Sequence, residues 1–258
     1  MKSKIRQFLK RIPLIGDLTI SIYRRLRLNK NSSTFWINKY LKNIDLNIVQ
    51  IGSNDGDTGD PIFELVKKNK RWKALFVEPV PYLFEKLKNN YNQDSRFIFE
   101  NVAINDGTNQ IFYSVKEEAK KQIANLPLWY DQLGSFNREH ILNHLDGILE
   151  PYIIETNVNG LTLSHLFKRN KIDNLDLLHI DTEGYDYKIL SQLDLKKYNP
   201  TIILFEHTHL QDSEKKKAVI FLKDNYYIFG FGGDFLCIIK NKLSENDFVT
   251  LKKNLITV

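Results

Sequence analysis

The sequence predicts an α/β fold in which helices cover a parallel sheet. Short, nearly continuous apolar runs are typical of strands buried on both faces, and amphipathic helical patterns lie between most of these runs. The alternation of the two predicts the layered architecture. With 258 residues, 42% of them hydrophobic and 26% charged, the chain can bury a core. One cysteine excludes both a disulfide framework and a cysteine-built zinc site, and fits a reducing cytoplasm.

The predicted elements follow in chain order. Apolar runs predict strands at 46–51, 74–77, 97–104, 175–180 and 201–205, and helical patterns predict helices at 61–70, 81–91, 161–170, 185–193 and 213–224. Residues 226–229 and 235–240, joined by a glycine-rich turn, predict an antiparallel hairpin that adds an edge to the sheet. Residues 113–160 show no clear sheet rhythm but concentrate aromatic and titratable groups. We expect them to form an insertion that caps the substrate site over the C-terminal strand ends.

The first 30 residues hold the basic excess of the chain. They carry nine basic residues and one acid, a net charge of +8, so the remainder carries −2 of the total +6. Two short amphipathic helices are predicted in a basic arm at 1–40, which precedes a catalytic domain at 41–258. Packing of the arm on its own domain or on a second subunit, and transient attachment to an anionic membrane surface, both stay open. Charge confined to the arm disfavours nucleic acid as a partner.

No apolar run approaches the length of a membrane span, and no signal-peptide core is present. We therefore expect a cytoplasmic protein, either soluble or peripheral to a membrane.

A glycine-containing turn follows the first predicted strand. Spaced glycines at a strand-to-helix turn let a ligand approach the backbone closely. The turn lacks the glycine pattern of dinucleotide binders and the GK[ST] of P-loops, and its acids would repel a diphosphate. A cationic cofactor such as S-adenosylmethionine suits it better, although a turn that only caps the following helix is the alternative. The candidate cofactor-binding residues here are Gly52, Ser53, Asn54, Asp55 and Gly56.

Candidate cofactor contacts also follow the second and third predicted strands. Glu78 lies 26 residues beyond the first glycine of the turn and precedes Pro79. An acid at this spacing can accept hydrogen bonds from both ribose hydroxyls of a bound adenosine, whereas the alternative is an acid that caps the next helix. Asn101, Val102 and Ala103 offer an amide beside small residues, which suits an adenine edge, although Asn101 can equally be a satisfied strand-end amide.

Six sequence blocks, in this order, resemble the FkbM-type family of S-adenosylmethionine-dependent methyltransferases. They are VQIGSNDG, FVEPV, ENVAI, GSFNREH, LHIDTEGYD and the strand at 200–207, and the resemblance covers roughly residues 46–240. It implies the class I methyltransferase fold, a Rossmann-like seven-stranded sheet of order 3-2-1-4-5-7-6. It also implies O-methylation of a hydroxyl on a sugar, polyketide or peptide natural product. Gln50 is one departure, because methyltransferases commonly carry an acid at this position, so other groups must bind the cofactor's amino group.

An alcohol must lose its proton as its oxygen attacks the methyl group, so positioning and a proton acceptor are needed. Candidates for this chemistry are Asp181, Glu183, Glu206 and His207 at predicted strand ends and His140 in the insertion. His140 has a titration range suited to a base, but a structural role in the cap is nearly as well supported.

Asp181, Glu206 and His207 can converge, because the two strands that they end are neighbours in a doubly wound sheet. They form a candidate metal site for Mg²⁺, Mn²⁺ or Fe²⁺, since catechol-type and macrolide-sugar O-methyltransferases place cation ligands at corresponding strand ends. The alternative needs no metal: Glu206 orients His207, which takes the proton, and Asp181 faces the cofactor or acts as the base.

Three other classes of function stay open. A dehydrogenase would need the dinucleotide glycine triplet, which is absent, and a nucleic-acid methyltransferase would need a target-base motif, which is also absent. A non-catalytic cofactor-binding module of the same fold is the third. The sequence favours an O-methyltransferase that acts on a small-molecule or glycan acceptor.

Overall fold

The computed structural model describes residues 30–42 and 44–257. The two amphipathic helices predicted in the basic arm lie outside the described residues. The chain divides into two compact units, 1–42 and 43–258, and each is described by itself. The described part of the first unit is the helix α3 (Ser33–Leu41), which begins where the Ser32 side chain accepts a hydrogen bond from the N–H of Phe35. Among the described residues, no helix combines the length and the apolar character needed to cross a membrane.

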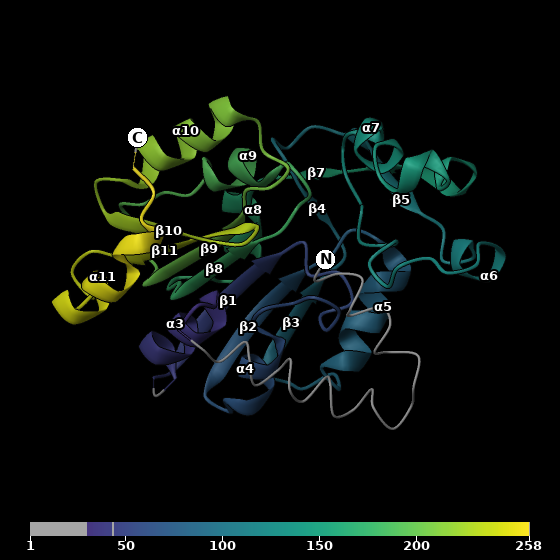
Figure 1. The fold of residues 1–258 in the computed structure, drawn as a ribbon. Coiled ribbons are helices and arrows are strands. Elements are labelled where there is room, and N and C mark those ends of the chain that lie inside the picture. The colour runs from purple at the N-terminus through teal and green to yellow at the C-terminus, as the bar shows by residue number, and fades with distance from the viewer. Residues whose placement is uncertain (1–29, 43, 258) are drawn as a thin grey trace, which may run out of the picture. The chain divides into compact units, whose positions relative to one another are not determined.

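A seven-stranded sheet forms the centre of the second unit (Figure 1). Its order is β10-β11-β9-β8-β1-β2-β3, and all neighbours are parallel except the pairs β10–β11 and β11–β9. Counted along the chain, this is the predicted order 3-2-1-4-5-7-6, so the expected class I fold is confirmed. The strands are β1 (Leu46–Ile51), β2 (Trp72–Val77), β3 (Phe97–Glu100), β8 (Leu177–Ile180), β9 (Ile202–Glu206), β10 (Tyr226–Phe231) and β11 (Asp234–Ile239).

The strand predicted at 97–104 is wrong in one respect. It divides into β3 and a two-residue strand β4 (Ala103–Ile104), which leaves the main sheet to pair with β7 (Gly160–Leu161). The break falls at Asn101, whose side-chain amide donates hydrogen bonds to the carbonyls of Glu78 and Pro79. The Asn101 side chain therefore provides hydrogen-bond donors for backbone carbonyls at the point where the hydrogen-bond ladder between β2 and β3 ends.

Helices pack on both faces of the sheet because the inner strands are apolar on both sides. Leu75 and Val77 of β2 belong to a core cluster shared with α8 (Leu163–Arg169), α9 (Asp186–Leu190) and α10 (Asp212–Leu222). Phe76, between them, points to the other face and stacks on Tyr91 at the end of α5 (Pro81–Asn90) with ring centroids 4.3 Å apart. The helices α4 (Phe63–Lys68) and α11 (Glu245–Leu251) complete the unit.

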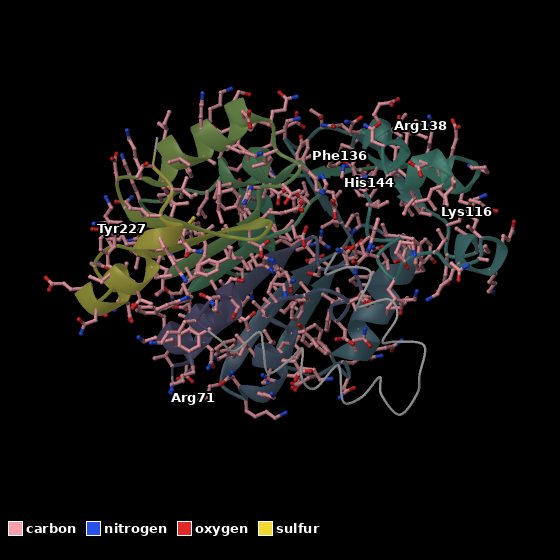
Figure 2. The ribbon with its side chains drawn as sticks, in the orientation of Figure 1. Arg71, Lys116, Phe136, Arg138, His144 and Tyr227 are labelled. Atoms are coloured by element: carbon pink, nitrogen blue, oxygen red, sulfur yellow. The ribbon has the colours of Figure 1, made fainter. Side chains whose placement is uncertain are left out.

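The insertion has more regular structure than its sequence predicts. Its ends pair as an antiparallel ribbon of β5 (Gln110–Val115) and β6 (Ile153–Val158), although the sequence shows no clear sheet rhythm here. The helices α6 (Ala119–Gln122) and α7 (Arg138–Leu142) and two short 3₁₀ turns lie between these strands. A small separate core holds them together, centred on Tyr130, Leu133 and Ile141. Figure 2 shows the side chains of this region, with Phe136 and His144 labelled.

Candidate functional site

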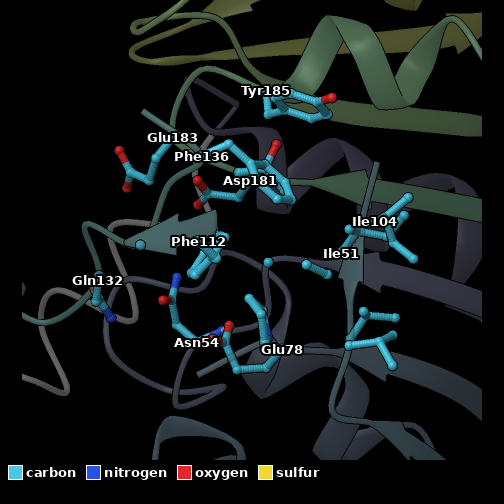
Figure 3. Close-up of a pocket in the computed structure, with 17 residues that line it drawn as sticks. Ile51, Asn54, Glu78, Ile104, Phe112, Gln132, Phe136, Asp181, Glu183 and Tyr185 are labelled. Atoms are coloured by element: carbon cyan, nitrogen blue, oxygen red, sulfur yellow. The ribbon is translucent and has the colours of Figure 1, made fainter. Parts of the chain in front are cut away.

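A pocket lies where the carboxyl ends of β1, β2 and β8 meet the insertion. It contains about 470 Å³ of space between side chains, including the part open to solvent. In Figure 3, Asp181 and Glu183 lie on one side, Asn54 and Glu78 on the opposite side, and Phe112 between them. The lining residues are Ile51, Gly52, Asn54, Val77, Glu78, Pro79, Val102, Ala103, Ile104, Phe112, Gln132, Gly134, Phe136, Asp181, Thr182, Glu183 and Tyr185.

Gly52 brings the turn after β1 against the loop after β8. Its φ of 77° is a conformation that side-chain-bearing residues rarely adopt, and a Cβ here would overlap the carbonyl oxygen of Asp181. The turn is fixed from the other side as well, because the N–H groups of Gly52 and Ser53 both donate to the carbonyl of Val77 at 3.0 Å. Glycine is therefore required for the backbone to form this wall of the pocket.

Three of the predicted turn residues shape the turn without lining the pocket. Ser53 is buried and its hydroxyl donates to the carbonyl of Gln50. Asp55 accepts hydrogen bonds from the N–H and the hydroxyl of Thr58, as expected of an acid that caps a turn. A Cβ at Gly56 would meet the side chains of α5. Within this segment, Gly52 and Asn54 line the pocket, whereas Asp55 caps the turn as the alternative interpretation expects.

Glu78 is 2% exposed and lines the pocket. Its two oxygens accept hydrogen bonds from the N–H groups of Asn54 and Val80, each at 2.8 Å. Burial raises the pKa of this carboxyl to about 7, although the two N–H donors oppose the shift. A carboxylate has about four lone-pair sites, so Glu78 can hold the turn after β1 and still accept a ligand's hydroxyl groups.

Of the three residues predicted to contact adenine, two line the pocket and one does not. Asn101 is exposed and does not line the pocket, because its amide is hydrogen-bonded to the carbonyls that end β2. Val102 and Ala103 do line it, and together with Ile104 and Phe112 they form an apolar wall. Phe112 belongs to the insertion, and sequence reasoning did not identify it.

The departure at Gln50 is accompanied by a nearby acid. Its side-chain nitrogen donates to Asp60 at 3.2 Å, and its side-chain oxygen is buried without a hydrogen-bond partner. A carboxylate is therefore present near this strand end, although it comes from the turn after β1 instead of from position 50.

Carboxylates crowd the opposite end of the pocket. Burial raises the pKa of Asp181 well above its ordinary range, and neighbouring Glu183 and Asp186 raise it further. The pKa of Glu206 rises to about 10, mainly through burial and then through Asp181. Crowding and burial oppose the ionisation of these carboxyl groups, and a positive charge beside them would favour their ionised forms, so this end of the pocket favours a cationic ligand over an anionic one.

The candidate set Asp181, Glu206 and His207 does not come together as a metal site. Among the described residues, the groups whose potential ligand atoms lie within 4.8 Å of one another are His140 with His144 and His209, and Glu183 with Glu206 and His209. Neither group contains His207.

His207 points elsewhere because successive side chains along a strand leave on opposite sides. Its ring stacks on Phe235 of β11, with ring centroids 4.0 Å apart. The backbone N–H of His207 donates to the carbonyl of Gly233. The residue within reach of Glu206 is His209, with 3.5 Å between Glu206 Oε1 and His209 Nε2. The proposed pairing of Glu206 with His207 is therefore wrong.

Two signals for the histidine group were present in the sequence. His140 and His144 are four residues apart, so they share one side of a helical turn, and His207-Thr208-His209 places a second histidine directly after β9. His209 itself could not be paired with His140 from the sequence, because the two come from segments 69 residues apart.

Comparison with protein families identifies one family. Residues 50–236 match the family described as Methyltransferase FkbM domain. The chain has no significant sequence match among curated proteins.

Three solved structures illustrate the structural similarity. Precorrin-6y C5,15-methyltransferase from Geobacter metallireducens GS-15 is 12% identical with a TM-score of 0.38, over 81% of this chain and 88% of that chain. A SAM-dependent methyltransferase from Aquifex aeolicus is 9% identical with a TM-score of 0.39, over 85% and 96%. M. capricolum TrmK with S-adenosyl-homocysteine is 16% identical with a TM-score of 0.35, over 82% and 72%.

Proposed function

The chain belongs to the FkbM methyltransferase family, and we propose that it methylates a hydroxyl group of a sugar, glycan or secondary metabolite, with S-adenosylmethionine as the methyl donor. The observation that carries the proposal is the pocket at the ends of β1, β2 and β8, which has a buried acid at one end and crowded carboxylates at the other.

The residues of the pocket fit this cofactor. Glu78 would accept the ribose hydroxyls, because its carboxylate is buried, lines the pocket and has unused lone pairs. The apolar wall of Val102, Ala103 and Phe112 would contact the adenine. The acid-rich end near Asp181 suits the sulfonium and amino groups, whose positive charge would favour ionised carboxylates there, whereas a diphosphate would oppose their ionisation. When bound, the cofactor supplies an activated methyl group on a sulfonium.

The chain's own residues would hold the acceptor and take its proton. Apart from Glu78, the carboxylates that line the pocket are Asp181 and Glu183, and both lie at the end distant from the ribose contact. We assign the role of proton acceptor to Asp181, which directly follows β8 and whose ionised form the positive charge of a bound cofactor would favour. Its loop is held in place, because the N–H of Asp181 donates to the carbonyl of Ile51 at 2.9 Å. Such positioning is the larger part of catalysis in a methyl transfer to an alcohol.

The side chains that the insertion contributes to the pocket favour an acceptor rich in oxygen atoms. Phe136 of the insertion packs against Tyr185 of the β8 loop, with ring centroids 4.9 Å apart, and both line the pocket beside Gln132 and Glu183. Aromatic faces next to carboxylate and amide groups provide both a stacking surface and hydrogen-bond partners, which a polyhydroxylated ring can use. The same two aromatic rings would exclude water from the reacting atoms.

Transfer from labelled S-adenosylmethionine to sugars, glycolipids, macrocycles and a control RNA tests the proposal. We expect label on a hydroxyl oxygen of one of the first three classes, identified by mass spectrometry and NMR. Asp181→Asn should lower kcat by about 10²-fold, whereas Asp106→Asn, which changes an exposed acid outside the pocket, should leave kcat unchanged. Label only in RNA, or cofactor binding without transfer to any class, would contradict O-methylation of a small acceptor.

A further inference from the structure

We propose that the protein binds one first-row divalent transition metal ion among His140, His144, His209, Glu183 and Glu206. Three separate segments bring these side chains together. The helix α7 and the residues after it supply His140 and His144, the loop after β8 supplies Glu183, and the end of β9 with the following loop supplies Glu206 and His209. This set replaces the one predicted from the sequence, with which it shares only Glu206.

Three distances between these atoms match those of ligands around one ion, and His209 belongs to both of the three-residue groups that lie within 4.8 Å. Glu183 Oε2 lies 3.1 Å from His140 Nε2 and 3.3 Å from His209 Nε2, and Glu206 Oε1 lies 3.5 Å from His209 Nε2. Two ligand atoms about 2.1 Å from a metal, at the tetrahedral angle, are about 3.4 Å apart. The observed separations therefore need little adjustment to accept an ion.

Several of these polar atoms are buried without a hydrogen-bond partner. The His140 side chain is only 9% exposed, and its Nε2 and Glu183 Oε2 lie 3.1 Å apart without hydrogen-bond geometry between them, so neither atom makes a hydrogen bond. Oε2 of Glu206 is also buried and makes no hydrogen bond. Leaving buried polar groups unpaired is costly, and native proteins usually avoid it. A bound cation would satisfy all three atoms together.

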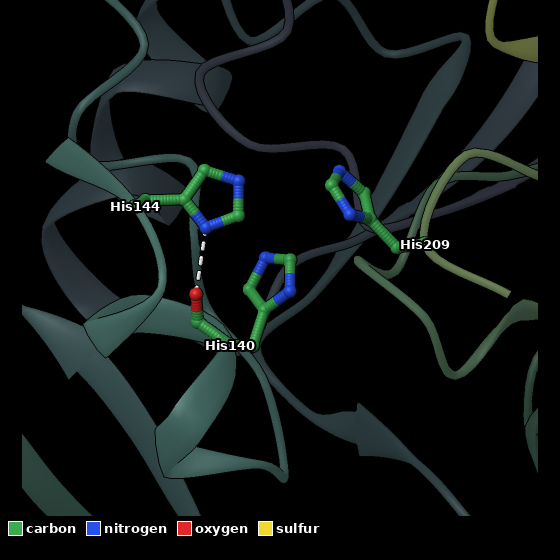
Figure 4. A group of neighbouring side chains, drawn as sticks. All are labelled: His140, His144 and His209. Carbon is green, nitrogen blue, oxygen red and sulfur yellow. Dashed lines mark hydrogen bonds between the residues drawn. The ribbon is translucent and has the colours of Figure 1, made fainter. Parts of the chain in front are cut away.

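The tautomer of His144 is set for metal ligation. Its Nδ1 lies 2.6 Å from the carbonyl oxygen of His140, and a carbonyl can only accept, so Nδ1 carries the proton. The neutral ring then has its lone pair on Nε2. Figure 4 shows this hydrogen bond and the rings of His140, His144 and His209 gathered together. Donation from one ring nitrogen to a carbonyl, leaving the other free, is the usual way in which proteins orient a metal-binding histidine.

The mixture of ligands indicates which kind of ion fits. Imidazoles suit zinc, iron and other first-row transition metals, whereas Mg²⁺ and Ca²⁺ prefer oxygen ligands with few exceptions. With histidines at three of five positions, we commit to a transition metal and not to magnesium.

Glu183 connects the metal site to the methyl-transfer pocket, because it also lines that pocket. An ion here would be positioned to bind an oxygen of the acceptor and to lower the pKa of the hydroxyl. This role rests on the proposed function, but the binding of the ion itself does not.

Metal binding is measured on the full-length protein without cofactor or acceptor. The protein is dialysed against EDTA, then titrated separately with Zn²⁺, Mn²⁺ and Co²⁺ by calorimetry, and the metal retained after gel filtration is counted. Wild type should hold about one ion per chain. His140→Ala and His209→Ala should each weaken binding by at least about tenfold. His165→Ala, which removes an exposed histidine on α8, and His207→Ala should retain it.

The two test variants come from different segments, so one stays informative if the other fails to fold, as judged by circular dichroism. No stoichiometric binding of any of the three ions by wild type overturns the proposal. So does undiminished binding in a folded His140→Ala or His209→Ala variant, or a loss in His207→Ala alone. Cofactor affinity is measured on the same metal-free protein, so an intact cofactor site with no metal site rejects only the metal.

Discussion

Gly52→Ala should disrupt the site more than any other single-methyl change in the turn after β1. Gly52 has a φ of 77°, and a Cβ at this position would overlap the carbonyl oxygen of Asp181. Both of the loops that it joins line the pocket. The matched control is Gly59→Ala in the same turn, where φ is 87° but a Cβ would meet only the side-chain oxygen of Gln132, at 3.9 Å.

Both variants lose folding stability through backbone strain, and Gly52→Ala loses more through a steric overlap. A side chain in the left-handed region costs roughly 1–2 kcal/mol at either position. At Gly52 the backbone must also move away from Asp181, which strains the hydrogen bonds from Asp181 N to Ile51 O and from Gly52 N to Val77 O. Each is worth about 1 kcal/mol. We therefore expect a loss of about 1–2 kcal/mol for Gly59→Ala and about 3–5 kcal/mol for Gly52→Ala.

Urea denaturation measures the stability change, and calorimetric titration with S-adenosylhomocysteine measures the effect on the site. Gly52→Ala should weaken cofactor binding by about 100-fold or more, because its two loops no longer keep their spacing, whereas Gly59→Ala should stay within about fivefold. If the two variants unfold within about 1 kcal/mol of each other and bind the cofactor equally, then the close approach of Gly52 to Asp181 does not organise this pocket.

Three further outcomes are expected. Glu78→Ala should raise the cofactor Kd by about 10- to 150-fold while changing saturated kcat little, because losing a charge-assisted acceptor costs roughly 1.5–3 kcal/mol; unchanged affinity in the folded variant removes Glu78 from the site. Glu78 should contribute a fall of about 2 kcal/mol to the stability of unliganded protein between pH 5.5 and 8, because its pKa is near 7 in the folded state and near 4.5 when unfolded, so the folded state loses a proton as pH rises. A Glu78→Ala variant with the same slope would assign that dependence to other groups. Deleting residues 1–30 should spare methyl transfer in solution and weaken sedimentation with anionic vesicles; loss of self-association with no vesicle effect would instead assign the arm to a subunit contact.

The strands and helices of this protein could be predicted because local pattern decides them. The run at 46–51 is β1 to the residue, and the predicted hairpin is β10 and β11, since a glycine pair between two apolar runs permits a tight turn. The ribbon of β5 and β6 could not be predicted, because its strands pair across the length of the insertion and are only half-buried. An apolar rhythm develops only where a strand has a face against a core.

By itself, the sequence determined the family, the strand order and the end of the sheet where the pocket lies, because these depend on motifs that directly follow strands. It also placed Glu78, Asp181 and the Gly52 turn at the pocket. Only the tertiary structure decided which side chains face one another. The direction of Glu206 is fixed by alternation along β9, and the chain then turns so that His209, and not His207, reaches it and meets His140 from the insertion. Such convergence depends on the packing of segments far apart in the chain, and no local pattern of residues contains that information.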